Sequence, residues 1–266
     1  MHHKSIQQHH LIKKITRKDT LFKGDYTLDP YQNCEFGCTY CDSSYDDTIY
    51  VNINAADLLK KEVKHLKKKR VILGSVHDPY QPIEKNYEIT RSLLHLLQQH
   101  DIPTHILTKS DLILRDLDIL TTMKQVWITF SIPSLDHNIW HTFEGITPSP
   151  INRLQIMKTI AKKNITTGIA IIPILPFIND KYHLLDSLIK NATQHQASYV
   201  LHGYLELKGN QKTILFSLLK NYNSTFLPAY QQFYNKSIRP PTTYINKIDQ
   251  TYNKICEKYD IASIIQ

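Results

Sequence analysis

Glycine, cysteine and long apolar stretches are all scarce in this sequence of 266 residues, and each shortage excludes a class of protein. No stretch approaches the roughly 18 to 20 consecutive apolar residues that a membrane-spanning helix needs. The four cysteines, three of them within eight residues, are too few and too clustered for a disulfide framework. The first residues, MHHKS, contain no apolar segment of a secretory signal. We therefore expect a cytoplasmic protein without a membrane partner.

The seven glycines do not form a nucleotide-binding loop of a familiar kind. Neither G-x-G-x-x-G nor a phosphate-loop motif occurs, which counts against a doubly wound dinucleotide-binding fold. Gly37 lies between two cysteines, and Gly74 ends a short apolar segment. At both positions glycine lets the backbone approach a bound group closely.

Positive charge exceeds negative charge, with a net charge of +8 and a pI of about 9.1. Such an excess permits binding to nucleic acid or another polyanion. The excess is partly local, because seven lysine and arginine residues crowd residues 60–70. Two interpretations of this segment stay open: a solvated helix face, or a contact surface for nucleic acid. The histidine pairs at 2–3 and 9–10 are expected in a disordered polar tail rather than at a metal site.

Strand-like and helix-like patterns alternate along most of the chain. Helices are expected at residues 55–69, 86–100, 111–123, from 149 onward and 179–194. Short apolar strands are expected at residues 26–28, 70–75, 104–108, 126–131, 166–172 and 198–207. Six β–α steps in a row imply a parallel sheet with right-handed crossovers, and six strands are too few for a closed eight-stranded barrel.

Three regions are predicted from this pattern. Residues 1–24 form an N-terminal extension, residues 25–210 carry the β–α steps, and residues 211–266 form a helical layer interrupted at Arg239-Pro240-Pro241. The last region is rich in tyrosine and phenylalanine. These rings either pack against the sheet or stack on a base or nucleoside.

The segment CEFGCTYC at residues 34–41 places Cys34, Cys38 and Cys41 at C-x3-C-x2-C spacing. Thiolates are soft ligands that select iron–sulfur clusters, zinc or Cu(I). A closed zinc site and a ferredoxin-type cluster both need four protein ligands. Three cysteines without a local fourth indicate a [4Fe–4S] cluster that leaves one iron open for chemistry.

Polar residues follow the predicted strands directly: Ser75 and Asp78 after the second, Lys109 after the third, and Ser131 at the end of the fourth. In parallel β/α barrels the active site lies at these carboxyl ends. The pattern is typical of a cofactor site, although serine, aspartate and lysine are also common in ordinary loops.

The cysteine spacing, with an aromatic residue before the last cysteine, resembles that of radical S-adenosylmethionine enzymes. Flanking segments are similar to the branch related to spore photoproduct lyase: LDPYQN (residues 28–33), HDPYQPIE (77–84), TKS (108–110) and LRDLD (114–118). The resemblance covers most of the chain. It implies an α/β fold built as a partial, open (β/α)6 TIM-like barrel with a C-terminal helical layer.

The resemblance also implies a reaction. Cys34, Cys38 and Cys41 would hold the [4Fe–4S] cluster, S-adenosylmethionine would bind its open iron, and reductive cleavage would give a 5′-deoxyadenosyl radical that abstracts hydrogen from a substrate. Lys109 would pair with the methionine carboxylate and Tyr40 would pack beside the adenine. Ser75 and Ser131 would bond the amino acid or ribose part. The partners implied are a flavodoxin- or ferredoxin-like electron donor and, as a candidate substrate, nucleic acid.

One departure separates this chain from spore photoproduct lyase, which uses a further cysteine as hydrogen-atom donor near the end of the second strand. Residues 74–84 contain no cysteine, and Cys256 is expected to be buried on a helix far along the chain. Tyr80, or another tyrosine, is the candidate for relaying a hydrogen atom instead, and Asp78 beside Tyr80 is the second catalytic candidate.

Two rival functions stay open. One is a zinc-binding module in which Asp42 or a histidine adds a fourth ligand. The other is a nucleic-acid-binding protein that keeps the fold without turnover.

Overall fold

The computed structural model describes residues 1–41, 47–66 and 69–265 of the chain. Its main sheet has seven strands in the order β10-β9-β8-β7-β6-β3-β2. Six of them run parallel, and β2 (Ile12–Lys14) pairs antiparallel with β3 at one edge. The six parallel strands are β3 (Tyr26–Leu28), β6 (Val71–Leu73), β7 (Thr104–Thr108), β8 (Val126–Ser131), β9 (Thr166–Ile174) and β10 (Tyr199–Tyr204). The predicted partial, open (β/α)6 barrel is confirmed.

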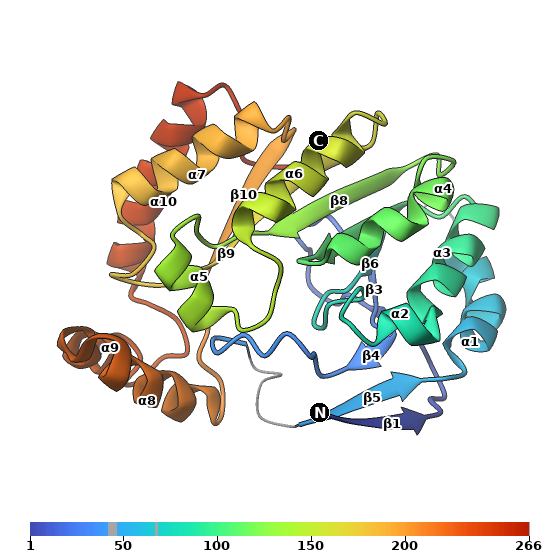
Figure 1. Ribbon diagram of the computed structural model, residues 1–266, viewed down its shortest axis with the longest axis horizontal. Coiled ribbons are helices and arrows are strands. Elements are labelled where there is room, and N and C mark those ends of the chain that lie inside the picture. Colours follow the sequence, from blue (N-terminus) through green and yellow to red (C-terminus); the bar gives the residue numbers. More distant parts are fainter. Residues whose placement is uncertain (42–46, 67–68, 266) are drawn as a thin grey trace.

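Helices cover the outside of this curved sheet (Figure 1). They form because apolar residues recur at helical spacing: Leu93, Leu94 and Leu97 of α3 are fully buried, as the sequence pattern predicts. Ser149 caps α6 by accepting from the Asn152 amide, with Pro150 in the first turn. The helices that lie between β3 and β10 along the chain are α1 (Ala55–Glu62), α2 (Glu84–Tyr87), α3 (Ile89–Gln99), α4 (Leu117–Leu120), α5 (His137–Phe143), α6 (Pro150–Ala161) and α7 (Tyr182–Gln194).

Two predicted helices are shorter than expected. The helix predicted at 55–69 ends at Glu62 and continues as a 3-10 helix, Val63–Leu66. The helix predicted at 111–123 is a 3-10 helix, Asp111–Asp116, followed by the single turn of α4. Lys67 and Lys68 lie outside the described residues, as does Asp42.

A second, small sheet was not foreseen. It has the order β1-β5-β4 and joins β1 (His2–Ile6), β5 (Thr48–Asn52) and β4 (Tyr31–Gln32). The prediction that the first histidine pair lies in a disordered tail is wrong, because His2 and His3 pair with Thr48 and Ile49. These strands are short and polar on one side, so their pairing is set by the fold rather than by local pattern.

Residues 19–24 close the barrel interior from the amino end of its strands. The carboxylate of Asp19 accepts the backbone N–H groups of Leu21, Phe22 and Gly24, which fixes the turn. The Phe22 ring then stands edge-on against His105 at 5.0 Å between centroids.

The C-terminal region is helical: α8 (Gln211–Asn223), a 3-10 helix (Ser224–Phe226), α9 (Leu227–Phe233) and α10 (Thr242–Lys258). Figure 1 shows α10 beside α7, and α8 with α9 at the lower left. Cys256 is buried on α10, as predicted. No helix among the described residues is long and apolar enough to cross a membrane.

Candidate active site

The cysteine loop lies at the carboxyl end of the barrel strands and is held from two sides. On one side the Glu35 amide donates to Gln81 Oε1 at 2.9 Å, and Gln81 Nε2 donates to the Asn33 carbonyl at 3.1 Å. The Glu35 carboxylate in turn accepts the Ile83 amide. The predicted HDPYQPIE segment therefore braces the loop that carries the cysteines.

On the other side, the end of α5 contacts the same loop. The Thr39 amide donates to the Phe143 carbonyl at 2.9 Å, and the Cys38 thiol lies 3.9 Å from the Glu144 carbonyl. Gly145 packs directly against the Phe36 carbonyl. The loop is thus clamped between two segments that are far apart in sequence.

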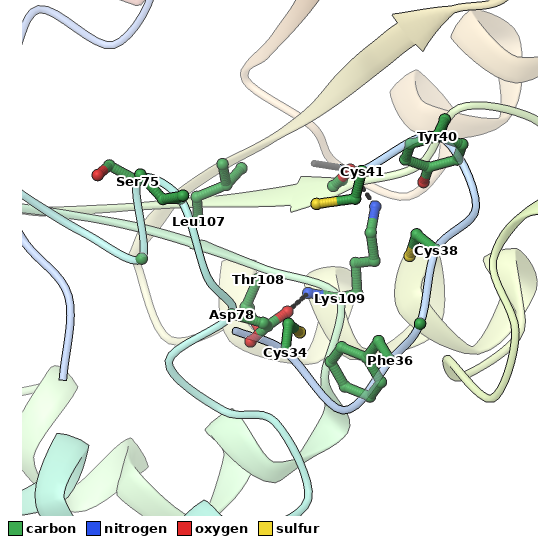
Figure 2. A pocket seen from close by; sticks show the side chains of 14 residues that line it. Cys34, Phe36, Cys38, Tyr40, Cys41, Ser75, Asp78, Leu107, Thr108 and Lys109 are labelled. Atoms are coloured by element: carbon green, nitrogen blue, oxygen red, sulfur yellow. Dashed lines mark hydrogen bonds between the residues drawn. The ribbon is translucent and has the colours of Figure 1, made fainter. Parts of the chain in front are cut away.

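A cavity of about 110 Å³ lies between this loop and the strand ends. Eight of the nine predicted site residues line it: Cys34, Cys38, Tyr40, Cys41, Ser75, Asp78, Lys109 and Ser131. Gly37 and Gly74 line it as well. Figure 2 shows the three cysteines on one loop around the Lys109 side chain.

The three cysteines could hold a cluster, since all three line the same cavity. In an iron–sulfur cluster each thiolate binds a different iron, so its ligands stand farther apart than those of one zinc ion. Burial raises the pKa of Cys38 to about 12 and also raises that of Cys34. Metal binding requires these thiols as thiolates, and the residues present fit a [4Fe–4S] cluster.

Lys109 meets a buried carboxylate that the sequence did not indicate. Its ammonium lies 2.9 Å from Glu144 Oε1 and donates to the Ser131 hydroxyl. Glu144 also pairs with fully buried Arg153 at 2.7 Å and accepts from the Tyr40 hydroxyl. Burial alone would raise the pKa of Glu144, but Lys109 and Arg153 outweigh it and hold the pKa at about 2. Two cations therefore share one carboxylate, so the group of Lys109, Arg153 and Glu144 carries one net positive charge.

Asp78 and Ser75 are hydrogen-bonded within the protein. Asp78 accepts from the Thr108 hydroxyl at 2.7 Å and from the Lys109 amide at 2.6 Å. Burial raises the pKa of this carboxyl group. The Ser75 hydroxyl donates to Asp29 at 2.8 Å, which ties the ends of β3 and β6 together. Asp78 thus fixes the backbone from which Lys109 extends.

Tyr80 lies outside the set of residues that line the cavity. Its side chain is fully buried on the far side of the loop, near Asp116, and borders a separate hollow with Pro82 and Arg115. Burial raises the pKa of its phenol. The structure brings Asp78 to the cavity without bringing Tyr80 there.

A larger hollow of about 660 Å³ adjoins the cavity and shares Tyr40, Cys41, Ser75, Lys109 and Ser131 with it. Its outer wall comes from the end of β10 and the C-terminal region: Gly203, Tyr204, Glu206, Lys208, Gln211 and Arg239. The Tyr204 hydroxyl donates to Asp249 on α10, and Arg239 and Lys208 both pair with Glu206. The small cavity therefore opens into a space large enough for a second molecule.

Glu144 and Arg153 were missed at the sequence level. The available signal was weak: a lone carboxylate before a glycine, in the loop after the fourth strand, and an arginine in the first turn of a helix. Neither signal indicates that Glu144 pairs with both Lys109 and Arg153.

Several known proteins are similar to this chain. The uncharacterized protein MJ0683 of Methanocaldococcus jannaschii is 28% identical over 248 residues, covering 89% of this chain and 88% of that protein. The uncharacterized protein Rv2578c of Mycobacterium tuberculosis is 25% identical over 255 residues, covering 89% of this chain and 75% of that protein.

Solved structures of spore photoproduct lyase share the fold. Its complex with dinucleoside spore photoproduct has a TM-score of 0.72 at 17% identity, covering 97% of this chain and 79% of that chain. A variant with bound AdoMet and dinucleoside spore photoproduct has a TM-score of 0.68 at 17% identity, covering 91% of this chain and 76% of that chain. The model of the radical SAM superfamily matches residues 28–188, more than half of the chain and all three clustered cysteines, and the protein therefore belongs to this superfamily.

Proposed function

We propose that this protein cleaves S-adenosylmethionine reductively and abstracts hydrogen from a substrate held in the larger hollow. A [4Fe–4S] cluster on Cys34, Cys38 and Cys41 and S-adenosylmethionine together would supply a 5′-deoxyadenosyl radical, given one electron from a flavodoxin- or ferredoxin-like donor. The protein's own residues bind, orient and exclude water around that chemistry.

The observation that carries the proposal is the shared cavity. Three cysteines, Lys109 and Ser131 line one small space at the carboxyl end of a parallel barrel, and that space opens into the larger hollow. Lys109 is assigned to the methionine carboxylate, because the group it forms with Glu144 and Arg153 carries one surplus positive charge. Such a charge-assisted contact is stronger than a neutral hydrogen bond. Tyr40, Ser75 and Ser131 are assigned to the rest of the cofactor.

The substrate class proposed is nucleic acid. Support comes from the net charge of +8, from cationic and aromatic side chains on the wall of the larger hollow, and from the lyase structures that hold a dinucleoside. Because Tyr80 lies away from the cavity, Tyr204 is the better candidate among the tyrosines for a residue that touches this substrate.

The test is anaerobic reconstitution with iron and sulfide, followed by reduction in the presence of S-adenosylmethionine. Release of 5′-deoxyadenosine is the expected result. Incubation with candidate nucleic acids, and mass analysis of the 5′-deoxyadenosine for deuterium drawn from labelled substrate, then identifies the hydrogen source. A protein that binds the cluster and S-adenosylmethionine but releases no 5′-deoxyadenosine under any reductant would contradict the proposal and favour a binding protein without turnover.

A further inference from the structure

A basic hollow of about 360 Å³ lies at the end of the barrel opposite the cofactor cavity. Lys14 pairs with the first residue of β3, and Lys69 stands just before β6, so both lie at the amino ends of the strands. The cofactor cavity is built from residues that follow the carboxyl ends, such as Ser75 and Lys109. The two openings therefore share no lining residue, and a group bound in the basic hollow does not touch the cofactor cavity.

The hollow is lined by five cationic side chains: Lys14, Arg17, Lys18, Lys23 and Lys69. Its two carboxylates are already engaged. Asp19 accepts three backbone N–H groups of its own turn. Asp25 accepts the Arg70 amide at 2.9 Å and lies 3.4 Å from Lys69 Nζ.

Four of the five cationic side chains have no carboxylate as an ion-pair partner among the described residues. Within residues 1–41, 47–66 and 69–265, Lys14, Arg17, Lys18 and Lys23 make no ion pair, and all four are exposed. The backbone beneath them is held in place, because Asp19 accepts the amides of its own turn and Gly24 packs so closely on Ile72 that a Cβ would lie 2.4 Å from it. A concave surface with unpaired positive charge favours a polyanion.

We propose that this hollow binds the phosphate backbone of a nucleic-acid strand, as an anchoring surface remote from the reacting atoms. The inference deepens the proposed function, since it rests on nucleic acid being the substrate. Flexible cations spread along a loop suit successive phosphates of a strand, which are bound without reading sequence.

A membrane surface fits less well. The large apolar side chains that are exposed among the described residues, such as Ile53, Val76 and Ile146, lie outside this hollow. Interfacial binding to lipid needs apolar side chains beside the cations.

The test compares two triple variants of equal net charge in the reconstituted protein. One combines Lys14→Glu, Arg17→Glu and Lys18→Glu. The matched control reverses exposed lysines on the C-terminal helices: Lys220→Glu, Lys247→Glu and Lys254→Glu. Fluorescence anisotropy with labelled oligodeoxythymidylate and with a mixed-sequence duplex gives affinity across a salt series.

The hollow variant is expected to bind at least roughly tenfold more weakly at low salt. The magnitude of the slope of log affinity against log salt concentration is expected to fall by up to about three. Each phosphate contact that is lost lowers this magnitude by about 0.9 on duplex DNA. The control is expected to keep most of both the affinity and the slope. Equal weakening in the two variants would mean that only net charge matters, and undetectable binding by the unsubstituted protein at low salt would also overturn the inference.

Cleavage of S-adenosylmethionine without substrate separates this inference from the proposed function. The hollow variant is expected to release 5′-deoxyadenosine at the unsubstituted rate, because its substitutions lie at the other end of the barrel. If the unsubstituted protein binds nucleic acid through the hollow but releases no 5′-deoxyadenosine, the reaction proposal fails and the binding surface stands.

Discussion

Lys109 holds its ammonium group against Glu144, at 2.9 Å, and against Ser131. The Lys109→Met substitution keeps the length of the side chain and removes its charge. Glu144 keeps Arg153 as a partner, so the variant is expected to fold and to load the cluster. Affinity for S-adenosylmethionine is expected to fall about ten- to a hundredfold, the value of one charge-assisted hydrogen bond of roughly 1.5 to 3 kcal/mol. Equilibrium binding measures it, and unchanged affinity would remove Lys109 from the cofactor site.

Substitution of Glu144 is expected to affect stability more than substitution of Lys109, because loss of the Glu144 carboxylate leaves both Lys109 and Arg153 without their ion-pair partner. Glu144→Gln is therefore expected to destabilise the fold by about 3–5 kcal/mol, as breaking a buried ion pair does. Denaturant unfolding of the Glu144→Gln and Lys109→Met variants measures the difference between their free energies of unfolding. A Glu144→Gln protein as stable as Lys109→Met would show that the pairing with Arg153 contributes little.

The four cysteines divide into two groups. Alanine at Cys34, Cys38 or Cys41 is expected to abolish the broad absorption of the iron–sulfur cluster, because each residue lines the cavity. Cys256→Ala is expected to keep it, because that side chain is buried on α10. Iron content and absorption after anaerobic reconstitution provide the check. A folded Cys256→Ala protein without a cluster would refute the three-ligand assignment.

Residues whose role depends on their place directly after a strand could be predicted from the sequence. Ser75, Lys109 and Ser131 each follow an apolar strand, and parallel strands bring their carboxyl ends together. Glu144 could not be found that way, since its partner Lys109 is 35 positions away and only the fold brings them together. Tyr80 stands two residues from Asp78, but the turn that lets Asp78 accept the Tyr80 amide sends the tyrosine ring to the other side.

At the scale of elements, the loop after α5 supports the cysteine loop through a close backbone approach. Gly145 has φ of +59°, and a Cβ there would lie 2.6 Å from the Phe36 carbonyl oxygen. Gly145→Ala is expected to push the cysteine loop aside and to lower the iron content of the reconstituted protein severalfold.

Gly209→Ala is the matched control for this prediction. Gly209 has φ of +52°, so alanine meets the same backbone strain of about 1 kcal/mol or more, but nothing lies within 4 Å of its Cβ. Its iron content is expected to match that of the unsubstituted protein. An equal decrease in iron content in both variants would assign the effect to backbone strain alone.

Helices and strands with a regular pattern of apolar residues could be predicted from the sequence. Those whose pairing depends on residues far away in the chain could not. The alternation of buried strands and amphipathic helices located all six parallel strands and α3. The strands β1 and β5 could not be predicted from the sequence, because β1 is almost entirely exposed and pairs with residues more than 40 positions away. The lysine-rich segment after Glu62 keeps apolar spacing but forms a 3-10 helix at Val63–Leu66.

At the scale of the whole molecule, a chain of polar groups crosses the barrel interior. His105 on β7 lies 2.7 Å from the Thr129 hydroxyl on β8, which lies 2.8 Å from the Tyr199 hydroxyl on β10. The other ring nitrogen of His105 faces the Phe22 carbonyl at 3.3 Å. A carbonyl only accepts, so Nδ1 carries the proton and Nε2 accepts from Thr129 when the ring is neutral.

Burial of His105 makes the stability of the whole barrel depend on pH. Burial lowers the pKa of this imidazole from 6.5 to about 4. Between these values the unfolded chain binds a proton that the folded protein does not, so stability is complete above about pH 6.5 and falls as the pH drops toward 4. The decrease from this one group is on the order of 3 kcal/mol.

His105→Gln is expected to flatten the pH dependence across this window, because glutamine can fill the same space without titrating. His100→Gln, at an exposed position after α3, is the control and is expected to keep the slope of the unsubstituted protein. Denaturant unfolding of cluster-free preparations, measured from neutral pH down to about 4, gives the three slopes. Identical slopes for His105→Gln and the unsubstituted protein would mean that the buried carboxylates, and not His105, set the acid limit of the fold.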